Sequence, residues 1–322
     1  MAKAGWLLTD NMRDLWGITT FFNPAGYRRR LENYRHFRRH LPVPLLAVEL
    51  SFDGRFDLGP ADADMVVQID GGAVLWQKER LLNVALAALP PTCTMVAWLD
   101  CDVVFGRPDW SEAVASGLER HALLQPFSHV HFMPPGWSPD AVGGAAVDVK
   151  HPPAFLIAGG ASVEAAVAFA GRDATQPAYT PGIAWAARRE LIMRHMLYDA
   201  CIMGGGDGAL MRAAYGFPSL TRDLQRMSPE RYDHYRAWAE PFGAAVGRER
   251  VGFVAGDAYH LWHGVPAKRR YTRRHADFAP FAFDPSADIA VAPNGAWRWS
   301  SPKPEMHAFL HAYFVERRED EE

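Results

Sequence analysis

Apolar runs and amphipathic segments alternate between residues 15 and 100, and this alternation limits the chain to few folds. The predicted strands are residues 15–22, 45–50, 65–69 and 95–100, and the predicted helices are residues 27–40 and 77–89. The strands are rich in Leu, Val and Ile, whereas the helices repeat their apolar residues with helical spacing. Pro90-Pro91 ends the second helix. The pattern is typical of a parallel, nucleotide-binding α/β half.

The composition permits a full hydrophobic core. The chain has 322 residues, of which 49% are hydrophobic, enough for one large α/β domain or two lobes. Its 34 basic and 37 acidic residues give a net charge of −3, which requires no polyanionic partner. Basic residues cluster at Arg28, Arg29, Arg30, Arg35, Arg38 and Arg39, and again at Lys268, Arg269, Arg270, Arg273 and Arg274. We interpret the first cluster as the solvated face of a helix.

Cysteine usage and hydropathy indicate the compartment. The three cysteines, Cys93, Cys101 and Cys201, lack metal-binding spacing, and their odd number argues against a disulfide framework. No apolar run approaches the ~18–20 residues of a membrane span, and the N-terminus lacks a basic-then-apolar leader. We therefore expect a cytoplasmic protein without a transmembrane segment. The charged tail at residues 316–322 is predicted to be a frayed helix end.

The regular alternation fades after residue 125. Residues 128–153 are dense in Gly and Pro and are predicted to form a long surface loop over a site. Residues 180–187 are predicted to form a strand, and residues 188–196 a helix. A short helix is expected at residues 209–215, and a final short strand at residues 257–263.

Two carboxylates interrupt the strand-like run from Met95 to Phe105. Asp100 and Asp102 follow the predicted strand at positions i and i+2, so they lie at the carboxyl edge of the sheet, where open α/β folds bind ligands. Their oxygen ligands suit Mg²⁺ or Mn²⁺ bridging a nucleotide diphosphate. In such a pair we expect Asp102 to reach the metal and Asp100 to face the ribose or donor sugar. A plain polar turn after a buried strand is the alternative.

Two histidines form a second candidate element. His260 and His263 are spaced i, i+3, which places them on one face of a helix or turn and makes a workable chelate. Imidazole nitrogens suit Mn²⁺ and the later transition metals better than Mg²⁺. Lys268, Arg269 and Arg270 follow closely, and cations beside a metal are what a departing diphosphate needs. No glutamate base lies inside the pair, which argues against a zinc hydrolase.

A glycine-flanked aspartate is the third element. Residues 203–208 read Met-Gly-Gly-Gly-Asp-Gly and lack the Gly-Lys-Ser/Thr ending of a Walker phosphate loop. Asp207 is predicted to cap the following helix, whose N-terminus favours the ionised carboxylate. Ionised and free of bulky neighbours, it could approach a substrate hydroxyl as a general base.

Taken in order, these elements resemble GT-A-fold nucleotide-sugar glycosyltransferases, nearest to the β-1,4-galactosyltransferase-like group, with glycosyltransferase family 2 as a broader relative. The similar segments, within about residues 17–275, are Ile18-Thr19-Thr20-Phe21-Phe22-Asn23, residues 76–85, Leu99-Asp100-Cys101-Asp102, Gly204-Gly205-Gly206-Asp207 and His260-Leu261-Trp262-His263. The chain departs from the family at Gly206, where the relatives carry Glu, and at Met203, where they carry Trp.

The resemblance implies a GT-A fold of the α/β class, with a Rossmann-like mixed sheet flanked by helices in one catalytic domain with acceptor-side loops. That domain would cover residues 1–290, with a nucleotide-binding half at about 15–125 and an acceptor half at 126–290. Residues 291–322 would pack on it as a C-terminal extension.

The resemblance also implies the activity. The chain would be a hexosyltransferase-like enzyme that moves a sugar from a nucleoside diphosphate, a UDP-sugar above all, to a hydroxyl of a glycan, lipid-linked or other acceptor. Mn²⁺, or Mg²⁺, would bind Asp102, His260 and His263, and Asp207 would act as the base of an inverting reaction. The predicted donor-binding residues are Asp100, Thr20, Phe22, Asn23, Asp70, Arg80, Lys268 and Arg269. The predicted acceptor-binding residues are Trp185, as a stacking platform for a sugar ring, and Gly205 and Gly206.

Three alternatives stay open at this point. A retaining transferase would not need Asp207 as a base. A catalytically silent protein that binds sugar nucleotides or carbohydrate would keep the same residues. The two basic clusters are also consistent with a nucleic-acid acceptor whose hydroxylated bases receive the sugar.

Overall fold

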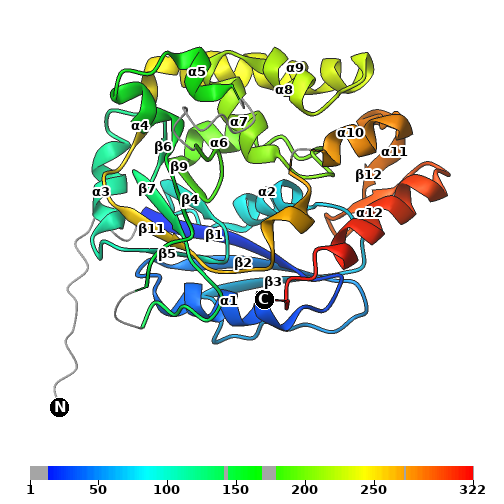
Figure 1. The fold of residues 1–322 in the computed structure, drawn as a ribbon, viewed down its shortest axis with the longest axis horizontal. Helices are drawn as coiled ribbons and strands as arrows, with labels where there is room; N and C mark the ends of the chain where they lie inside the picture. Colours follow the sequence, from blue (N-terminus) through cyan, green and yellow to red (C-terminus); the bar gives the residue numbers. More distant parts are fainter. Residues whose placement is uncertain (1–13, 141–143, 169–178, 272, 322) are drawn as a thin grey trace.

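A seven-stranded mixed sheet forms the centre of the molecule (Figure 1). The computed structural model describes residues 14–140, 144–168, 179–271 and 273–321. The strands are β1 (Leu15–Phe22), β2 (Leu45–Ser51), β3 (Met65–Asp70), β4 (Met95–Leu99), β5 (Val103–Phe105), β6 (Leu123–Gln125), β7 (His129–Phe132), β8 (Asp148–Lys150), β9 (Ala184–Arg188), β10 (Val251–Phe253), β11 (Asp257–His260), β12 (Ile289–Val291) and β13 (Trp297–Trp299). The central sheet has the order β10-β6-β9-β4-β1-β2-β3.

The first four strands confirm the predicted parallel half. β1 pairs in parallel with β2 and β4, and β2 pairs in parallel with β3. β9 is antiparallel to both β4 and β6, which makes the sheet mixed, as predicted. The carboxyl ends of β1–β4 therefore meet at one edge, where Asp100 follows β4.

Helices cover both faces of this sheet, α1 on one side and α2 on the other (Figure 1). The helices are α1 (Arg28–Arg39), α2 (Lys78–Ala88), α3 (Trp110–Gly117), α4 (Pro153–Ala158), α5 (Val163–Val167), α6 (Arg189–His195), α7 (Gly206–Tyr215), α8 (Pro218–Leu224), α9 (Pro229–Val246), α10 (Arg274–Phe278), α11 (Pro285–Asp288) and α12 (Pro304–Glu316). Predicted helices 27–40, 77–89 and 188–196 correspond to α1, α2 and α6.

Two hydrophobic cores follow from the alternation of side chains along the strands. In β1, Ile18 and Phe22 enter the core shared with α2, α7, α9 and α12. Leu15 and Phe21 enter the opposite core, with Tyr34 of α1 and residues of α3. Because β1 and β2 are buried on both faces, they read as continuous apolar runs in the sequence.

A second sheet carries part of the candidate site. Its order is β5-β11-β7-β8, and β11 pairs antiparallel with β5 and parallel with β7. The prediction of a loop at residues 128–153 is therefore wrong in part, because β7 and β8 lie within that segment. The strand predicted at residues 257–263 ends at His260, and it is not the last, since β12 and β13 form a hairpin after it.

The C-terminal segment is integrated into the fold. Leu310, Tyr313 and Phe314 of α12 belong to the core on the α2 face of the sheet. The prediction that the tail is a frayed helix end is wrong, because the side chain of Glu319 is only 1% exposed and pairs with arginines. Among the described residues, no helix combines the length and the apolar character that a membrane crossing requires.

Candidate active site

The turn between β4 and β5 positions the two predicted carboxylates. Asp100, Cys101 and Asp102 occupy this turn at the carboxyl edge of the central sheet. The Thr19 hydroxyl donates to the Leu99 carbonyl at 2.8 Å, and the Asp100 amide donates to the Ile183 carbonyl at 2.9 Å. These bonds tie the turn to strand β1 and to the segment before β9.

Asp102, His260 and His263 form a compact cluster. Each offers one ligand atom, and the three atoms lie within 4.8 Å of one another. His260 Nε2 lies 3.5 Å from Asp102 Oδ1, and His263 Nδ1 lies 3.3 Å from Asp102 Oδ2. His260 is the last residue of β11 and His263 lies in the loop after it, so the pair does not lie on a helix.

The chemistry of this cluster fits a divalent cation. Asp102 Oδ1 is buried and has no hydrogen-bond partner among the described residues. Burial, together with the charges of Arg269 and Lys150, lowers the pKa of His260 to about 3, so its imidazole is neutral at physiological pH. One carboxylate and two imidazoles are a ligand set that suits Mn²⁺.

Lys78 joins the other two aspartates. Its Nζ lies 2.5 Å from Asp100 Oδ1 and 2.8 Å from Asp207 Oδ2. Lys78 comes from the first turn of α2, Asp100 from the turn after β4 and Asp207 from the first turn of α7. Sequence reasoning missed this lysine, because a charged first turn ordinarily reads as a solvated helix end.

Burial and charge act against each other in this cluster. Burial raises the pKa of Asp100 and of Asp207, and the charge of Lys78 partly offsets the increase. Burial alone would lower the pKa of Lys78, but attraction to both aspartates raises it well above the usual value. Lys78 therefore stays positive and favours the ionised form of both carboxylates.

Helix α7 begins earlier than predicted, and Asp207 is not its cap. The helix starts at Gly206, and Gly205 is the N-cap residue, with a φ of 90° that favours glycine. Asp207 therefore lies inside the first turn, where the helix dipole also favours a negative charge. Its carboxylate is 22% exposed, so it is reachable from the site.

Glu79 is a second acid near Asp207, and the sequence did not indicate it as a site residue. Glu79 is 5% exposed, and neither of its carboxyl oxygens has a hydrogen-bond partner among the described residues. A Cβ atom at Gly206 would lie 2.1 Å from Glu79 Oε1. Glu79 thus fills the space that a side chain at position 206 would need, and burial raises its pKa.

This contact predicts the effect of a methyl group at position 206. Gly206→Ala should lower the free energy of unfolding by about 1–3 kcal/mol, because the new Cβ overlaps a buried carboxyl group. Chemical denaturation of the single variants and of the Gly206→Ala/Glu79→Ala pair measures the coupling. The double variant should recover part of the loss. If the losses of unfolding free energy in the two single variants simply add in the double variant, Glu79 does not restrict position 206.

Most predicted donor-binding residues already have partners. Phe22 is 3% exposed, and its ring packs against Trp76 and Phe314, so the prediction that it contacts a nucleotide base is wrong for this structure. The Asn23 side chain bonds both the amide and the carbonyl of Tyr27 and so closes a turn.

Three further donor-binding candidates differ in where the fold places them. Thr20 is 9% exposed and lies near the end of β1, the parallel neighbour of β4, which Asp100 follows. Asp70 ends edge strand β3, which is separated from β4 by β2 and β1. Arg80 pairs with Asp199 at 3.0 Å and packs over the Trp297 ring.

The predicted acceptor platform is also wrong for this structure. Trp185 is 0% exposed in the core of the central sheet, and its Nε1 donates to the Pro181 carbonyl at 2.8 Å. A fully buried ring has no face on which a sugar could stack. Of the other acceptor candidates, Gly205 and Gly206 do adjoin Asp207 at the start of α7.

The basic clusters are largely engaged by carboxylates. In the first cluster, Arg38 pairs with Asp64 at 3.0 Å, and Arg30 is not on a solvated face, because its side chain is 18% exposed and pairs with Glu319 at 2.6 Å. In the second cluster, Lys268 pairs with Glu321 at 2.5 Å.

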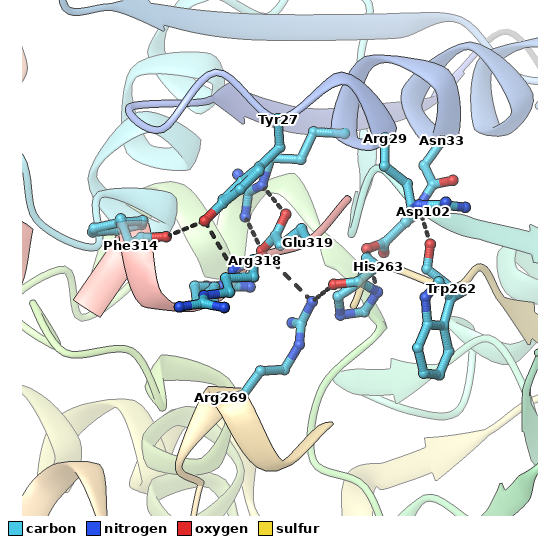
Figure 2. Close-up of polar contacts among 12 residues, drawn as sticks. Tyr27, Arg29, Asn33, Asp102, Trp262, His263, Arg269, Phe314, Arg318 and Glu319 are labelled. Carbon is cyan, nitrogen blue, oxygen red and sulfur yellow. Dashed lines mark hydrogen bonds and ion pairs between the residues drawn. The ribbon is translucent and has the colours of Figure 1, made fainter. Parts of the chain in front are cut away.

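Arg269 connects the loop of His263, in the candidate cation site, to the tail. Its Nη2 donates to the His263 carbonyl at 2.5 Å and lies 3.6 Å from Glu319 Oε1 (Figure 2). Glu319 also pairs with Arg317 at 2.7 Å. Burial alone would raise the pKa of Glu319, but attraction to Arg30, Arg317 and Arg269 lowers it to about 2.

This ion cluster predicts a pH-dependent contribution to stability. The shift of Glu319 from 4.5 to about 2 corresponds to roughly 3 kcal/mol of folding free energy. Because the folded pKa is lowered, the contribution is present above about pH 4.5 and is lost as the pH falls towards 2. The difference in unfolding free energy between the wild type and Glu319→Gln should therefore shrink over this range. The matched control is Glu316→Gln, and a difference that stays constant with pH would contradict the assignment.

Comparison with known proteins gives structural neighbours only. No protein-family model and no curated protein matches the sequence. Residues 1–349 of S. aureus TarS are 12% identical, with a TM-score of 0.40, and the match covers 82% of this chain and 64% of that one. The chain therefore spans less than two thirds of that neighbour.

A second neighbour is glucosyl-3-phosphoglycerate synthase from Mycobacterium tuberculosis, solved with Mn²⁺ and UDP-glucose. It is 12% identical, with a TM-score of 0.42, and the match covers 89% of this chain and 86% of that one. A third neighbour is described as a nucleotide-diphospho-sugar transferase from Desulfovibrio desulfuricans G20; it is 11% identical, with a TM-score of 0.37, and the match covers 77% of this chain and 82% of that one. Because the TM-scores are below 0.5, the function must be argued from the chain's own residues.

Proposed function

We propose that this chain is a metal-dependent glycosyltransferase that moves a sugar from a nucleoside-diphosphate donor to an acceptor hydroxyl. One observation supports this most directly. Lys78 contacts both Asp207 and Asp100, and Asp102, two residues further along the same turn, belongs to the cluster with His260 and His263. Lys78 therefore links the candidate base on α7 to the turn that carries the candidate cation site, at the ligand-binding edge of the sheet.

The residues of the site have separate roles in the proposed reaction. Asp102, His260 and His263 would hold Mn²⁺ or Mg²⁺, which when bound supplies Lewis-acid stabilisation of charge on a departing diphosphate, worth several kcal/mol. Asp207 takes the proton of the acceptor hydroxyl. Its burial strengthens it as a base, while Lys78 keeps it ionised. Attack from the face opposite the diphosphate inverts the anomeric carbon.

The resemblance to nucleotide-sugar glycosyltransferases supports a donor and an acceptor class. The donor is a UDP-sugar whose ribose or sugar is oriented by Asp100, and the acceptor is a glycan, a lipid-linked glycan or another hydroxyl compound. Residues 15–125 form the nucleotide half, residues 126–290 form the acceptor half, and residues 291–322 extend them. A nucleic-acid acceptor receives no support, because many cations of the basic clusters are already paired with carboxylates.

A thermal-shift screen of nucleotide sugars with and without Mn²⁺ tests the proposal. A true donor at about 100 times its Kd should raise the melting temperature by a few degrees, and only when the metal is present. If no nucleotide sugar stabilises the protein in the presence of metal, the proposed function is wrong. If one stabilises it but is never hydrolysed or transferred, the chain is a binding protein instead.

A further inference from the structure

Three successive acids of the C-terminal tail, Glu319, Asp320 and Glu321, contact cationic or N–H groups that could also bind other anions. The carboxylate of Glu319 pairs with Arg30 and Arg317 and lies 3.6 Å from Arg269. Asp320 accepts hydrogen bonds from the Arg28 and Arg29 amides, at 3.1 and 2.9 Å, at the start of helix α1. Glu321 pairs with Lys268 at 2.5 Å. Each acid therefore has its own cationic or N–H partner.

These partners lie beside the candidate cation site. Arg269 bonds the carbonyl of His263, and Figure 2 shows Glu319 beside Arg269, with His263 and Asp102 next to them. A Cβ atom at Gly264, the residue after His263, would lie 2.9 Å from the Glu319 Cα. The tail backbone thus runs along the loop that carries a candidate metal ligand.

Buried guanidinium groups require an anion. Arg269 and Arg317 have side chains that are 7% and 2% exposed, so leaving them unpaired would carry a large desolvation penalty. Carboxylates and phosphates are both recognised by the guanidinium fork, and phosphates carry more charge and more acceptor oxygens. A phosphate beside the cation site could take over the same partners.

We propose that Arg30, Arg269 and Lys268 form a binding site for the diphosphate of the donor, which Glu319 and Glu321 fill until a diphosphate displaces them. The inference rests on the proposed function and deepens it, because it assigns Arg30 to the donor site and makes the tail an internal competitor. Only molecules whose tail is displaced can bind the diphosphate, so the apparent affinity is the intrinsic affinity multiplied by the fraction of such molecules.

The irregular structure and exposed contacts of the tail favour an exchange of its partners. Helix α12 ends at Glu316, and residues 317–321 form no further helix or strand. The bonds of Asp320 to α1 and the Glu321–Lys268 pair are exposed to solvent, so breaking them costs little. Glu319 is the one deeply buried anchor among these three acids, and a phosphate on Arg30 and Arg269 would offset its loss.

Hydrogen exchange of the wild-type protein tests the inference without a substitution. Inorganic pyrophosphate with Mn²⁺ is the probe, because it lacks the base, the ribose and the sugar. Saturating probe should increase amide exchange in residues 317–321 relative to Mn²⁺ alone. Unchanged or stronger protection of these amides while pyrophosphate is bound would overturn the inference, since the tail would then be a fixed brace.

Calorimetric titration of variants supplies the second measurement. Glu319→Gln should bind Mn²⁺-pyrophosphate about tenfold more tightly than the wild type, because the competing carboxylate is removed. Arg30→Gln should bind it more weakly. Glu316→Gln is the matched control, since this acid pairs with Arg270 at the end of α12, and its affinity should equal that of the wild type. Equal affinities for Glu319→Gln and Glu316→Gln would contradict the proposal.

The outcomes separate this inference from the proposed function. If pyrophosphate displaces the tail but no nucleotide sugar is turned over, the diphosphate site stands and the transferase activity fails. If nucleotide sugars are turned over while the tail stays protected, the activity stands and the competition fails.

Discussion

Replacing Asp207 by asparagine should lower turnover by about 10²–10⁴-fold while leaving donor binding largely intact. The amide has nearly the same shape as the carboxylate but cannot take a proton from an acceptor hydroxyl. Because Asp207 lies in the first turn of α7, outside the Asp102–His260–His263 cluster, the substitution leaves the candidate cation ligands in place. The loss should therefore fall on kcat, and the donor Kd should change little.

Steady-state kinetics, together with calorimetry of the donor, separate these quantities. Asp223→Asn is the matched control, because this exposed aspartate contacts its neighbour Arg222, and it should retain wild-type turnover. The anomeric configuration of the product adds an independent check. A retained configuration, or an Asp207→Asn variant with wild-type kcat, would remove Asp207 from the role of base.

Replacing Asp102 by asparagine should weaken Mn²⁺ binding by at least about 100-fold, since even outer-shell substitutions at metal sites cost about 10–100-fold. Asp102 is the only carboxylate of the three-residue cluster, so the variant loses the charge that attracts the cation. Donor binding should become insensitive to Mn²⁺, and activity should fall to the level of chelator-treated wild type.

Electron paramagnetic resonance of free Mn²⁺ measures this affinity directly. Asp109→Asn serves as the control, because Asp109 pairs with Arg107 on the surface a few residues further along the chain. Full Mn²⁺ affinity in Asp102→Asn would place the cation elsewhere. His263→Ala removes a candidate ligand but leaves the Asp102 carboxylate in place. Weaker Mn²⁺ binding in this variant would show that the loss of a ligand matters apart from the loss of carboxylate charge.

The parallel half of the fold was predictable because three of its four strands are buried on both faces. β1, β2 and β4 carry unbroken apolar runs, and their boundaries agree with the predicted ones to within one residue. β7 was missed, although His129-Val130-His131-Phe132 alternates with a period of two, because the surrounding glycines and prolines suggested a loop. The early start of α7 was missed because glycines rarely begin a helix.

The grouping of the candidate cation ligands was predictable because these residues lie at or just after strand ends. Asp102, His260 and His263 were identified from strand-end placement and short spacing, and the fold brings them together across about 160 positions. Lys78, Glu79 and Arg30 were not identified, because each lies in a charged helical turn that looks solvated in isolation. Only long-range packing, such as the contact of Arg30 with Glu319, buries them.

Anomalous diffraction from crystals grown with Mn²⁺ and a nucleoside diphosphate locates both the cation and the phosphates. We expect one strong Mn²⁺ peak within coordination distance of Asp102, His260 and His263, with the phosphates beside it and in reach of Arg269. A peak bound by other residues, or phosphates bound away from the turn between β4 and β5, would contradict this expectation.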